Sequence, residues 1–198
     1  MKHLLQLDYE KFKATRDFLQ DVAKVLGKVQ QVFIKAQPHE WHKGLEIAES
    51  GLQTQKLSNG KRITLDLHRG VVQAGKIQWL LTDYSAQQLF IELAAWAKSN
   101  GAKKVPNKPE FATKQPRINS KQTKALANAL LWVQTILRDV KKDINTGTTS
   151  PILLYPHHFD LSLVWFPNND DTQLGLGFST GDVYIAKPYF YIISYPEL

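Results

Sequence analysis

Residues 150–166 read SPILLYPHHFDLSLVWF, and this stretch indicates the fold most clearly. Two apolar runs flank a short polar segment that contains His157, His158 and Asp160. In the second run, apolar side chains occupy every second position from 159 to 165, which is the spacing of a β-strand. The stretch therefore predicts two strands joined by a turn that carries ionisable side chains.

On the C-terminal side, residues 168–171 are predicted to form an acidic turn, and residues 174–179, with two glycines, a loop. Residues 183–195 are predicted to form a strand, with Pro188 at its start or at a bulge. Apolar residues fall on both faces of this strand, which is typical of strands buried inside a sheet. We therefore expect the last strand to be central and buried.

On the N-terminal side, three segments have apolar residues at helical spacing, and they cover about 8–34, 85–100 and 120–144. Asp8 and Ser85 are the predicted N-caps of the first two, and Ser120 opens the third. Between the first two helices, the chain alternates apolar and polar residues in five short segments: 45–48, 52–57, 62–68, 71–74 and 76–82. The Asn59-Gly60 pair predicts a hairpin among them, so these segments form an antiparallel meander.

The order helix, strands, two helices and strands predicts an α+β protein: an antiparallel sheet of several strands packed against about three helices. A chain of 198 residues fits a single domain, 1–198, with a basic, proline-containing loop at about 98–120 between two helices. The chain has no cysteine, which excludes disulfides and thiolate chemistry. No signal peptide and no apolar run of about 18 residues is present, so we expect a soluble, cytoplasmic protein with no membrane contact.

The net charge of +7 is concentrated in residues 98–124, which hold eight lysine or arginine residues and the single acid Glu110. Such a segment is either a solvated connection or a loop that contacts nucleic-acid phosphates. It contains one aromatic residue, Phe111, whereas surfaces that stack on single strands usually contain several. Nucleic acid is therefore an unlikely partner, and contact through this loop is kept as an alternative.

The polar faces of the predicted strands and turns suggest a site built from histidine and carboxylate side chains. Its candidate residues are His42, Asp66, His68, His157, His158 and Asp160, with His39 and Glu46 nearby in the sequence. Histidine and carboxylate are the usual ligands of divalent metals in a chain without cysteine, and His42, His157 and Asp160 are the candidate ligands. No spacing here is diagnostic, and each residue could instead be an ordinary surface or turn residue.

The same residues also suit acid–base chemistry without metal, because a carboxylate beside a histidine raises its basicity and fixes its tautomer. The sequence lacks the Gly-x-Ser-x-Gly, GxGxxG and Walker motifs, so serine hydrolysis, dinucleotide binding and P-loop chemistry have no support. The catalytic residues, the reaction and the oligomeric state therefore stay open.

A binding module for a small molecule is the contrasting hypothesis. Five aromatic residues could line a pocket for an apolar or aromatic ligand: Trp41, Trp165, Tyr189, Tyr191 and Tyr195. Aromatic side chains in strands are more often part of the core, so these residues could equally be structural.

Several short motifs occur in a characteristic order along the chain. They are Trp41-His42, Ser150-Pro151, Phe159-Asp160-Leu161 and the terminal Tyr195-Pro196-Glu197. In this order they resemble a family of bacterial proteins known only as a domain of unknown function, over about residues 27–198. The resemblance implies one domain, and the family brings no established activity or cofactor.

Overall fold

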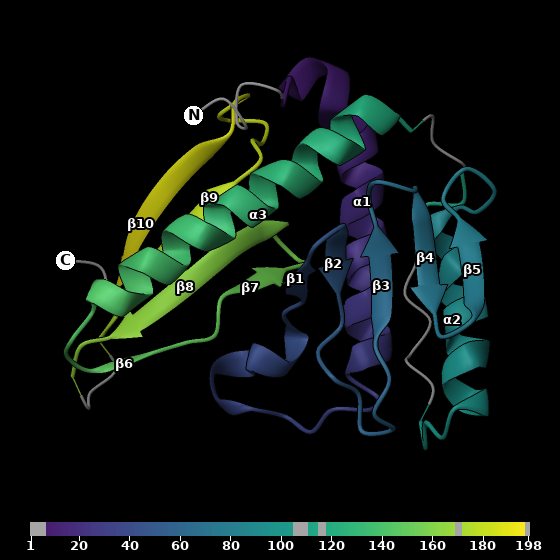
Figure 1. Cartoon of the computed structure of the whole chain (residues 1–198), viewed down its shortest axis with the longest axis horizontal. Helices are drawn as coiled ribbons and strands as arrows, with labels where there is room; N and C mark the ends of the chain where they lie inside the picture. Colours follow the sequence, from purple (N-terminus) through teal and green to yellow (C-terminus); the bar gives the residue numbers. More distant parts are fainter. Residues whose placement is uncertain (1–6, 105–110, 115–117, 169–171, 197–198) are drawn as a thin grey trace.

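The computed structural model describes residues 7–104, 111–114, 118–168 and 172–196 (Figure 1). This part of the chain forms, in order, α1 (Tyr9–Gln30), η2 (Pro38–Lys43, a 3₁₀ segment), β1 (Glu46–Ala48), β2 (Gly51–Gln53), β3 (Ile63–Asp66), β4 (Val71–Ala74), β5 (Ile77–Leu80), α2 (Ala86–Ser99), α3 (Ser120–Asp143), β6 (Thr148–Thr149), β7 (Leu153–Tyr155), β8 (Asp160–Phe166), β9 (Gln173–Ser179) and β10 (Tyr189–Tyr195).

The strands form two antiparallel sheets of five strands each. The first has the order β1-β2-β3-β4-β5, and the second has the order β10-β9-β8-β6, with β7 also paired to β8. Leu45 and Leu154 exchange two backbone hydrogen bonds, each with an N to O distance of 2.8 Å, and so join the two sheets. The predicted α+β class is confirmed, with two sheets in place of one.

The helices begin where the sequence places polar caps. The Asp8 side chain accepts a hydrogen bond from the Lys11 backbone N–H, and Ser85 forms a reciprocal capping box with Gln88. Asn119, one residue before the predicted start, caps α3. These caps satisfy backbone N–H groups that have no partner inside the helix.

One buried cluster contains side chains from the three α-helices and from both sheets. The helix α1 packs against α2, α3 and η2, and α3 packs against β1, β2 and β8. In Figure 1, α3 runs obliquely across the second sheet, while α1 stands behind β2 and β3 of the first. The single domain stays a prediction, and this shared core is in keeping with it.

Several boundaries differ from the sequence prediction, and among them β10 begins at Tyr189 and not at residue 183, while β2 ends at Gln53 and not at residue 57. The α-helix α1 ends at Gln30 and not near residue 34. The backbone N–H groups of residues 32 and 33 donate to the carbonyls three residues earlier, Val29 and Gln30, which is the spacing of a 3₁₀ turn and not of an α-helix. The predicted turn at 145–150 contains the short strand β6. The predicted loop at 174–179 is wrong, because these residues belong to β9, where Gly177 leaves room for the ring of Tyr191 on β10.

The expectation of a buried, central last strand is also wrong. β10 lies at the end of the second sheet, and several of its apolar side chains are exposed. Apolar residues on both faces indicate burial only when a second layer covers each face and a neighbour pairs with each edge.

The basic loop falls partly on residues 105–110 and 115–117, and the acidic turn on 169–171, which lie outside the described residues. Nucleic-acid contact through residues 98–124 therefore stays an untested alternative. Within the described ranges, none of the helices combines the length and the apolar character needed to cross a membrane.

Candidate functional site

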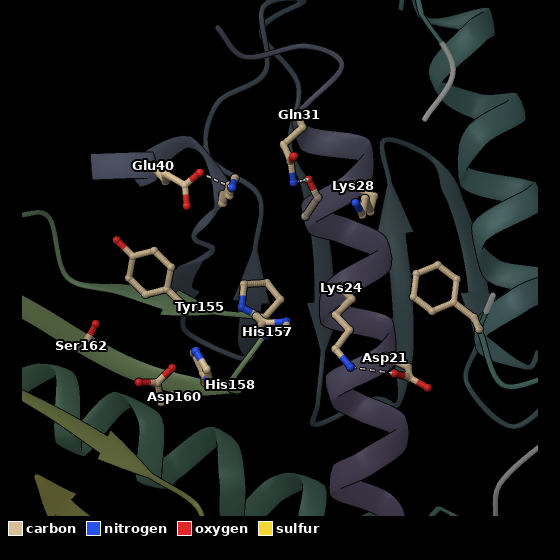
Figure 2. A pocket seen from close by; sticks show the side chains of 14 residues that line it. Asp21, Lys24, Lys28, Gln31, Glu40, Tyr155, His157, His158, Asp160 and Ser162 are labelled. Carbon is tan, nitrogen blue, oxygen red and sulfur yellow. Dashed lines mark hydrogen bonds and ion pairs between the residues drawn. The ribbon is translucent and has the colours of Figure 1, made fainter. Parts of the chain in front are cut away.

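A cleft of about 780 Å³ opens between α1 and the turn that joins β7 to β8 (Figure 2). Its walls come from α1, η2, β7, β8 and that turn. The lining residues are Asp21, Lys24, Gly27, Lys28, Gln31, Glu40, Lys43, Phe111, Tyr155, Pro156, His157, His158, Asp160 and Ser162. A cavity of this volume is large enough for a small molecule.

The β7–β8 turn is held in place from two sides. The buried Phe159 adopts a left-handed conformation with φ of 58°, and its N–H donates to the Tyr155 carbonyl at 2.8 Å. The side-chain amide of Gln20 on α1 donates to the His157 carbonyl at 2.6 Å. A non-glycine residue with positive φ persists only where its surroundings compensate for the strain. The fold thus fixes the backbone that presents His157, His158 and Asp160.

Asp160 is the most unusual ionisable group in the cleft. Its Oδ2 accepts a hydrogen bond from the phenol of Tyr191, whereas its Oδ1 is buried and has no partner in the described part of the chain. Burial raises the pKa of Asp160, and the Tyr191 hydrogen bond and the neighbouring His158 partly oppose that rise. Figure 2 shows His158 and Asp160 side by side at the cleft wall. One carboxyl oxygen of Asp160 thus has unused hydrogen-bonding capacity within the described part of the chain.

Tyr191 reaches Asp160 by crossing the strand between them. Gly177 on β9 stands opposite both Ser162 on β8 and Tyr191 on β10. A Cβ at Gly177 would collide with the Tyr191 ring, so the glycine allows the ring to lie across β9. Burial, followed by the charge of Asp160, raises the pKa of Tyr191, so its phenol keeps its proton and donates.

Most of the other charged side chains that line the cleft are paired with one another. Lys24 pairs with Asp21 at 3.2 Å, and Lys43 pairs with Glu40. The hydrogen bond from Lys43 lowers the pKa of Glu40. Lys28, in contrast, forms no ion pair with any residue that the structure describes. Among the described residues, the cleft therefore contains an ammonium group and a carboxyl oxygen of Asp160 that have no partner.

Tyr155 and a strained segment complete the walls. Burial, with smaller contributions from Asp160 and Glu40, raises the pKa of Tyr155 to about 12, so its phenol is neutral. His39 and Glu40 both have positive φ, 50° and 59°, within η2. The ring of His39 packs on Phe166 with a centroid distance of 4.3 Å, and Glu40 and Lys43 of the same segment line the cleft.

The structure brings together three of the six predicted polar residues, His157, His158 and Asp160. His42 does not line the cleft, and its Nδ1 accepts a hydrogen bond from the Gln37 N–H at 3.1 Å. Asp66 caps a turn by accepting from the N–H groups of His68 and Arg69. His68 lines a separate cavity of about 170 Å³.

The metal hypothesis gains no geometric support. Within the described ranges, no three histidine or carboxylate side chains converge as a metal would need, and His42 lies apart from His157 and Asp160. Glu46 instead pairs with Arg62, and His39 packs on Phe166.

The five aromatic candidates do not gather around the cleft either. Trp41 packs against His39, and the Nε1–H of Trp165 donates to the Thr146 carbonyl at 2.8 Å. The Tyr189 phenol donates to Asp182 at 2.7 Å, and Tyr195 is exposed. Only Tyr191 acts at the cleft, from behind Asp160.

The sequence analysis names no candidate site residue on α1, because the spacing of its apolar residues indicates only a helix. Lys24, Gly27, Lys28 and Gln31 recur at intervals of three, one and three residues on one face of α1. This polar stripe beside a glycine was the available signal, since residues three and four apart share a helix face.

Comparison with known proteins gives a match of part of the chain to one family model, and no activity. No curated protein and no solved structure matches the chain. The expected resemblance to a family of unknown function is confirmed, although over a different part of the chain. Trp41-His42 lies in the matched part, whereas Phe159-Asp160-Leu161 and the terminal motif lie outside it. It is residues 4–88, which include α1 and the first sheet, that match the family of unknown function DUF5996.

Proposed function

We propose that the cleft binds a small anionic molecule and that Asp160 exchanges a proton with it, as a general acid or base that needs no metal. The observation that carries this proposal is the buried, unpartnered Oδ1 of Asp160 at the wall of a cavity of about 780 Å³. Buried polar atoms normally have a partner, so an unpartnered carboxyl oxygen beside a cavity supports a role for Asp160 in binding or catalysis.

The two oxygens of Asp160 have separate roles in this proposal. Oδ2 is held by the Tyr191 phenol, so the carboxyl group cannot rotate freely, and Oδ1 is the atom that takes or gives the proton. A raised pKa brings the carboxyl closer to neutral pH, where both protonation states are accessible. Tyr155 and Tyr191 keep their protons and so remain hydrogen-bond donors.

The unpaired ammonium group of Lys28 supports an anionic ligand. The other two lysines that line the cleft are paired with carboxylates, so they add little net charge. A carboxylate or phosphate on the ligand would form an ion pair with Lys28. A hydroxyl group, or a C–H group next to a carbonyl, would then lie beside Asp160 and exchange the proton. Binding without chemistry is the second candidate, and the size of the cleft favours it equally.

The test is a binding screen with small carboxylates and phosphate monoesters, read from the imidazole NMR resonances of His157 and His158. We expect one class to shift these resonances and Lys28→Met to weaken its binding at least tenfold. Lys13→Met removes a lysine from α1 outside the cleft and should bind as the native chain does. Equal affinity in Lys28→Met, or no shift with either class, would refute an anionic ligand.

The chemical step is tested on the compound that binds. Its conversion is followed by NMR with the native chain, Asp160→Asn and Asp139→Asn, a control on the exposed side of α3. Turnover that Asp160→Asn alone abolishes supports acid–base chemistry. Binding without turnover in the native chain leaves the ligand-binding function and rejects the enzyme.

A further inference from the structure

The strand β10 has an edge that no described strand covers. β9 pairs with one side of it, and β10 is the last strand of the sheet. Its seven residues, YFYIISY, contain no charge, and four large side chains are exposed: Phe190 at 45%, Ile192 at 72%, Ile193 at 60% and Tyr195 at 58%. Proteins usually protect such an edge with lysine, an internal proline or a bulge. None of these occurs between residues 189 and 195, so the edge is suited to pairing with another strand.

We propose that β10 pairs with β10 of a second copy of the chain, antiparallel about a twofold axis at Ile192. The two second sheets then form one continuous sheet of ten strands. Such an interface is isologous, because the same strand serves both partners. Backbone hydrogen bonds along the edge supply the pairing, and the exposed side chains beside it lose contact with water.

The positions of two prolines favour a second copy of the chain, and not an unrelated strand, as the partner of β10. Pro188 and Pro196 lie four residues before and four residues after Ile192. In a twofold pairing centred on Ile192, Pro188 of one copy stands opposite Pro196 of the other, so neither interrupts the ladder. Proline has no N–H to donate, and it therefore ends the ladder at the same place on both strands.

The side chains along this register are mutually compatible. Ile192 faces its own copy, Tyr191 faces Ile193, and Tyr189 faces Tyr195. All these positions are uncharged, so no like charges oppose each other. The rings of Tyr191 and Tyr189 keep their contacts with Asp160 and Asp182, and the exposed Ile192, Ile193 and Tyr195 supply the apolar surface beside the edge. This matters because each copy carries a net charge of +7, which disfavours contact through charged surfaces.

The edge strand of the first sheet is the competing surface. β5 also has exposed apolar side chains, Ile77 at 50% and Leu80 at 49%, but it has only four residues. A ladder of seven residues makes more hydrogen bonds and buries more apolar surface than one of four. We therefore expect the interface between the two copies to form at β10 and not at β5.

The mass in solution tests this proposal, by light scattering after size-exclusion chromatography at about 100 µM protein. We expect the native chain at twice 22.6 kDa and Ile192→Lys at 22.6 kDa. Ile91→Lys changes an isoleucine of similar exposure, 54%, on α2, and Ile77→Lys changes the edge of β5. Both should remain dimeric, and circular dichroism should show native folding in all variants. A monomeric native chain, a folded dimeric Ile192→Lys variant, or a monomer formed by Ile77→Lys would overturn the proposal.

The absence of cysteine allows a direct test of the register. Ile192→Cys places one thiol at the twofold axis, where opposing Cα atoms of an antiparallel pair lie about 4.5–5.5 Å apart, within the range for a disulfide. Mild oxidation should link most Ile192→Cys chains into covalent dimers and leave Ile91→Cys chains largely unlinked. Equal cross-linking of the two variants would exclude the proposed pairing. This result is independent of whether the cleft binds a ligand.

Discussion

The phenol of Tyr191 donates a hydrogen bond to Oδ2 of Asp160 across the glycine strand β9, although the two residues are 31 positions apart. The contact links the last strand of the chain to the cleft wall. Oδ1 of the same carboxyl group has no partner within the described ranges, and this carboxyl group is the one for which we propose chemistry.

Removal of the Tyr191 hydroxyl should raise the pKa of Asp160 further. The hydrogen bond from Tyr191 lowers that pKa against the effect of burial, so Tyr191→Phe removes a stabilising contact of the ionised form. We also expect a loss of roughly 1–2 kcal/mol in the free energy of unfolding near neutral pH. Carboxyl ¹³C NMR titration and urea unfolding measure the two effects. Tyr195→Phe, an exposed tyrosine of the same strand, is the control, and an equal change in both variants would contradict the assignment.

The stability of the protein should depend on pH through Asp160. Its pKa in the folded protein is raised above the ordinary value of 3.8. The contribution of the protonated carboxyl group to the free energy of unfolding is therefore fully present below pH 3.8, and it is lost as the pH rises through the pKa of the folded state. Asp160→Asn does not titrate, so the native chain should lose more free energy of unfolding than this variant as the pH rises from 4 to 7. Urea unfolding at several pH values measures the difference.

The control for this pH dependence is Asp139→Asn, which removes an exposed carboxylate on α3. We expect its pH profile to follow the native one. Parallel profiles of the native chain and Asp160→Asn would show that Asp160 titrates alike in the folded and unfolded states.

Gly177 should tolerate no side chain while Tyr191 crosses it. A Cβ there would overlap the Tyr191 ring, and Gly177→Ala should cost about 1–3 kcal/mol of stability and break the contact with Asp160. Gly175 lies in the same strand, but its nearest neighbour would be the Ile193 carbonyl at 3.8 Å. Gly175→Ala should therefore be close to neutral. Thermal unfolding of the two variants tests this, and similar losses in both would argue against the ring crossing at Gly177.

Chelation should leave the cleft unchanged if its chemistry needs no metal. Treatment with EDTA is expected to shift neither the melting temperature nor the His157 and His158 resonances. Elemental analysis of the untagged protein provides the second reading. Near-stoichiometric zinc, iron or manganese, together with a lower melting temperature after chelation, would contradict this prediction and support a metal site with histidine and carboxylate ligands.

Some residues of the cleft could be predicted from the sequence, and others could not. The polar segment at 157–160 was recognised because three ionisable side chains interrupt an apolar pattern, and the structure does place them in the cleft. The α1 wall was missed, because an amphipathic helix gives no local sign of what its polar face meets. His42 and Asp66 were grouped with them because they lie on the polar faces of predicted strands and turns, but local hydrogen bonds already occupy both.

The sequence by itself determined the elements whose pattern is local. The caps at Asp8 and Ser85, the three helices and the meander of β1 to β5 follow from the spacing of apolar residues and from hydrogen bonds within a few positions. Only the tertiary structure decided that residues 173–179 form a strand, that β10 lies at an edge, and that Tyr191 reaches Asp160. A glycine-rich segment carries no periodic signal of its own, and an apolar strand does not encode how many neighbours it has. Those outcomes depend on contacts between distant residues, which form only when the layers pack.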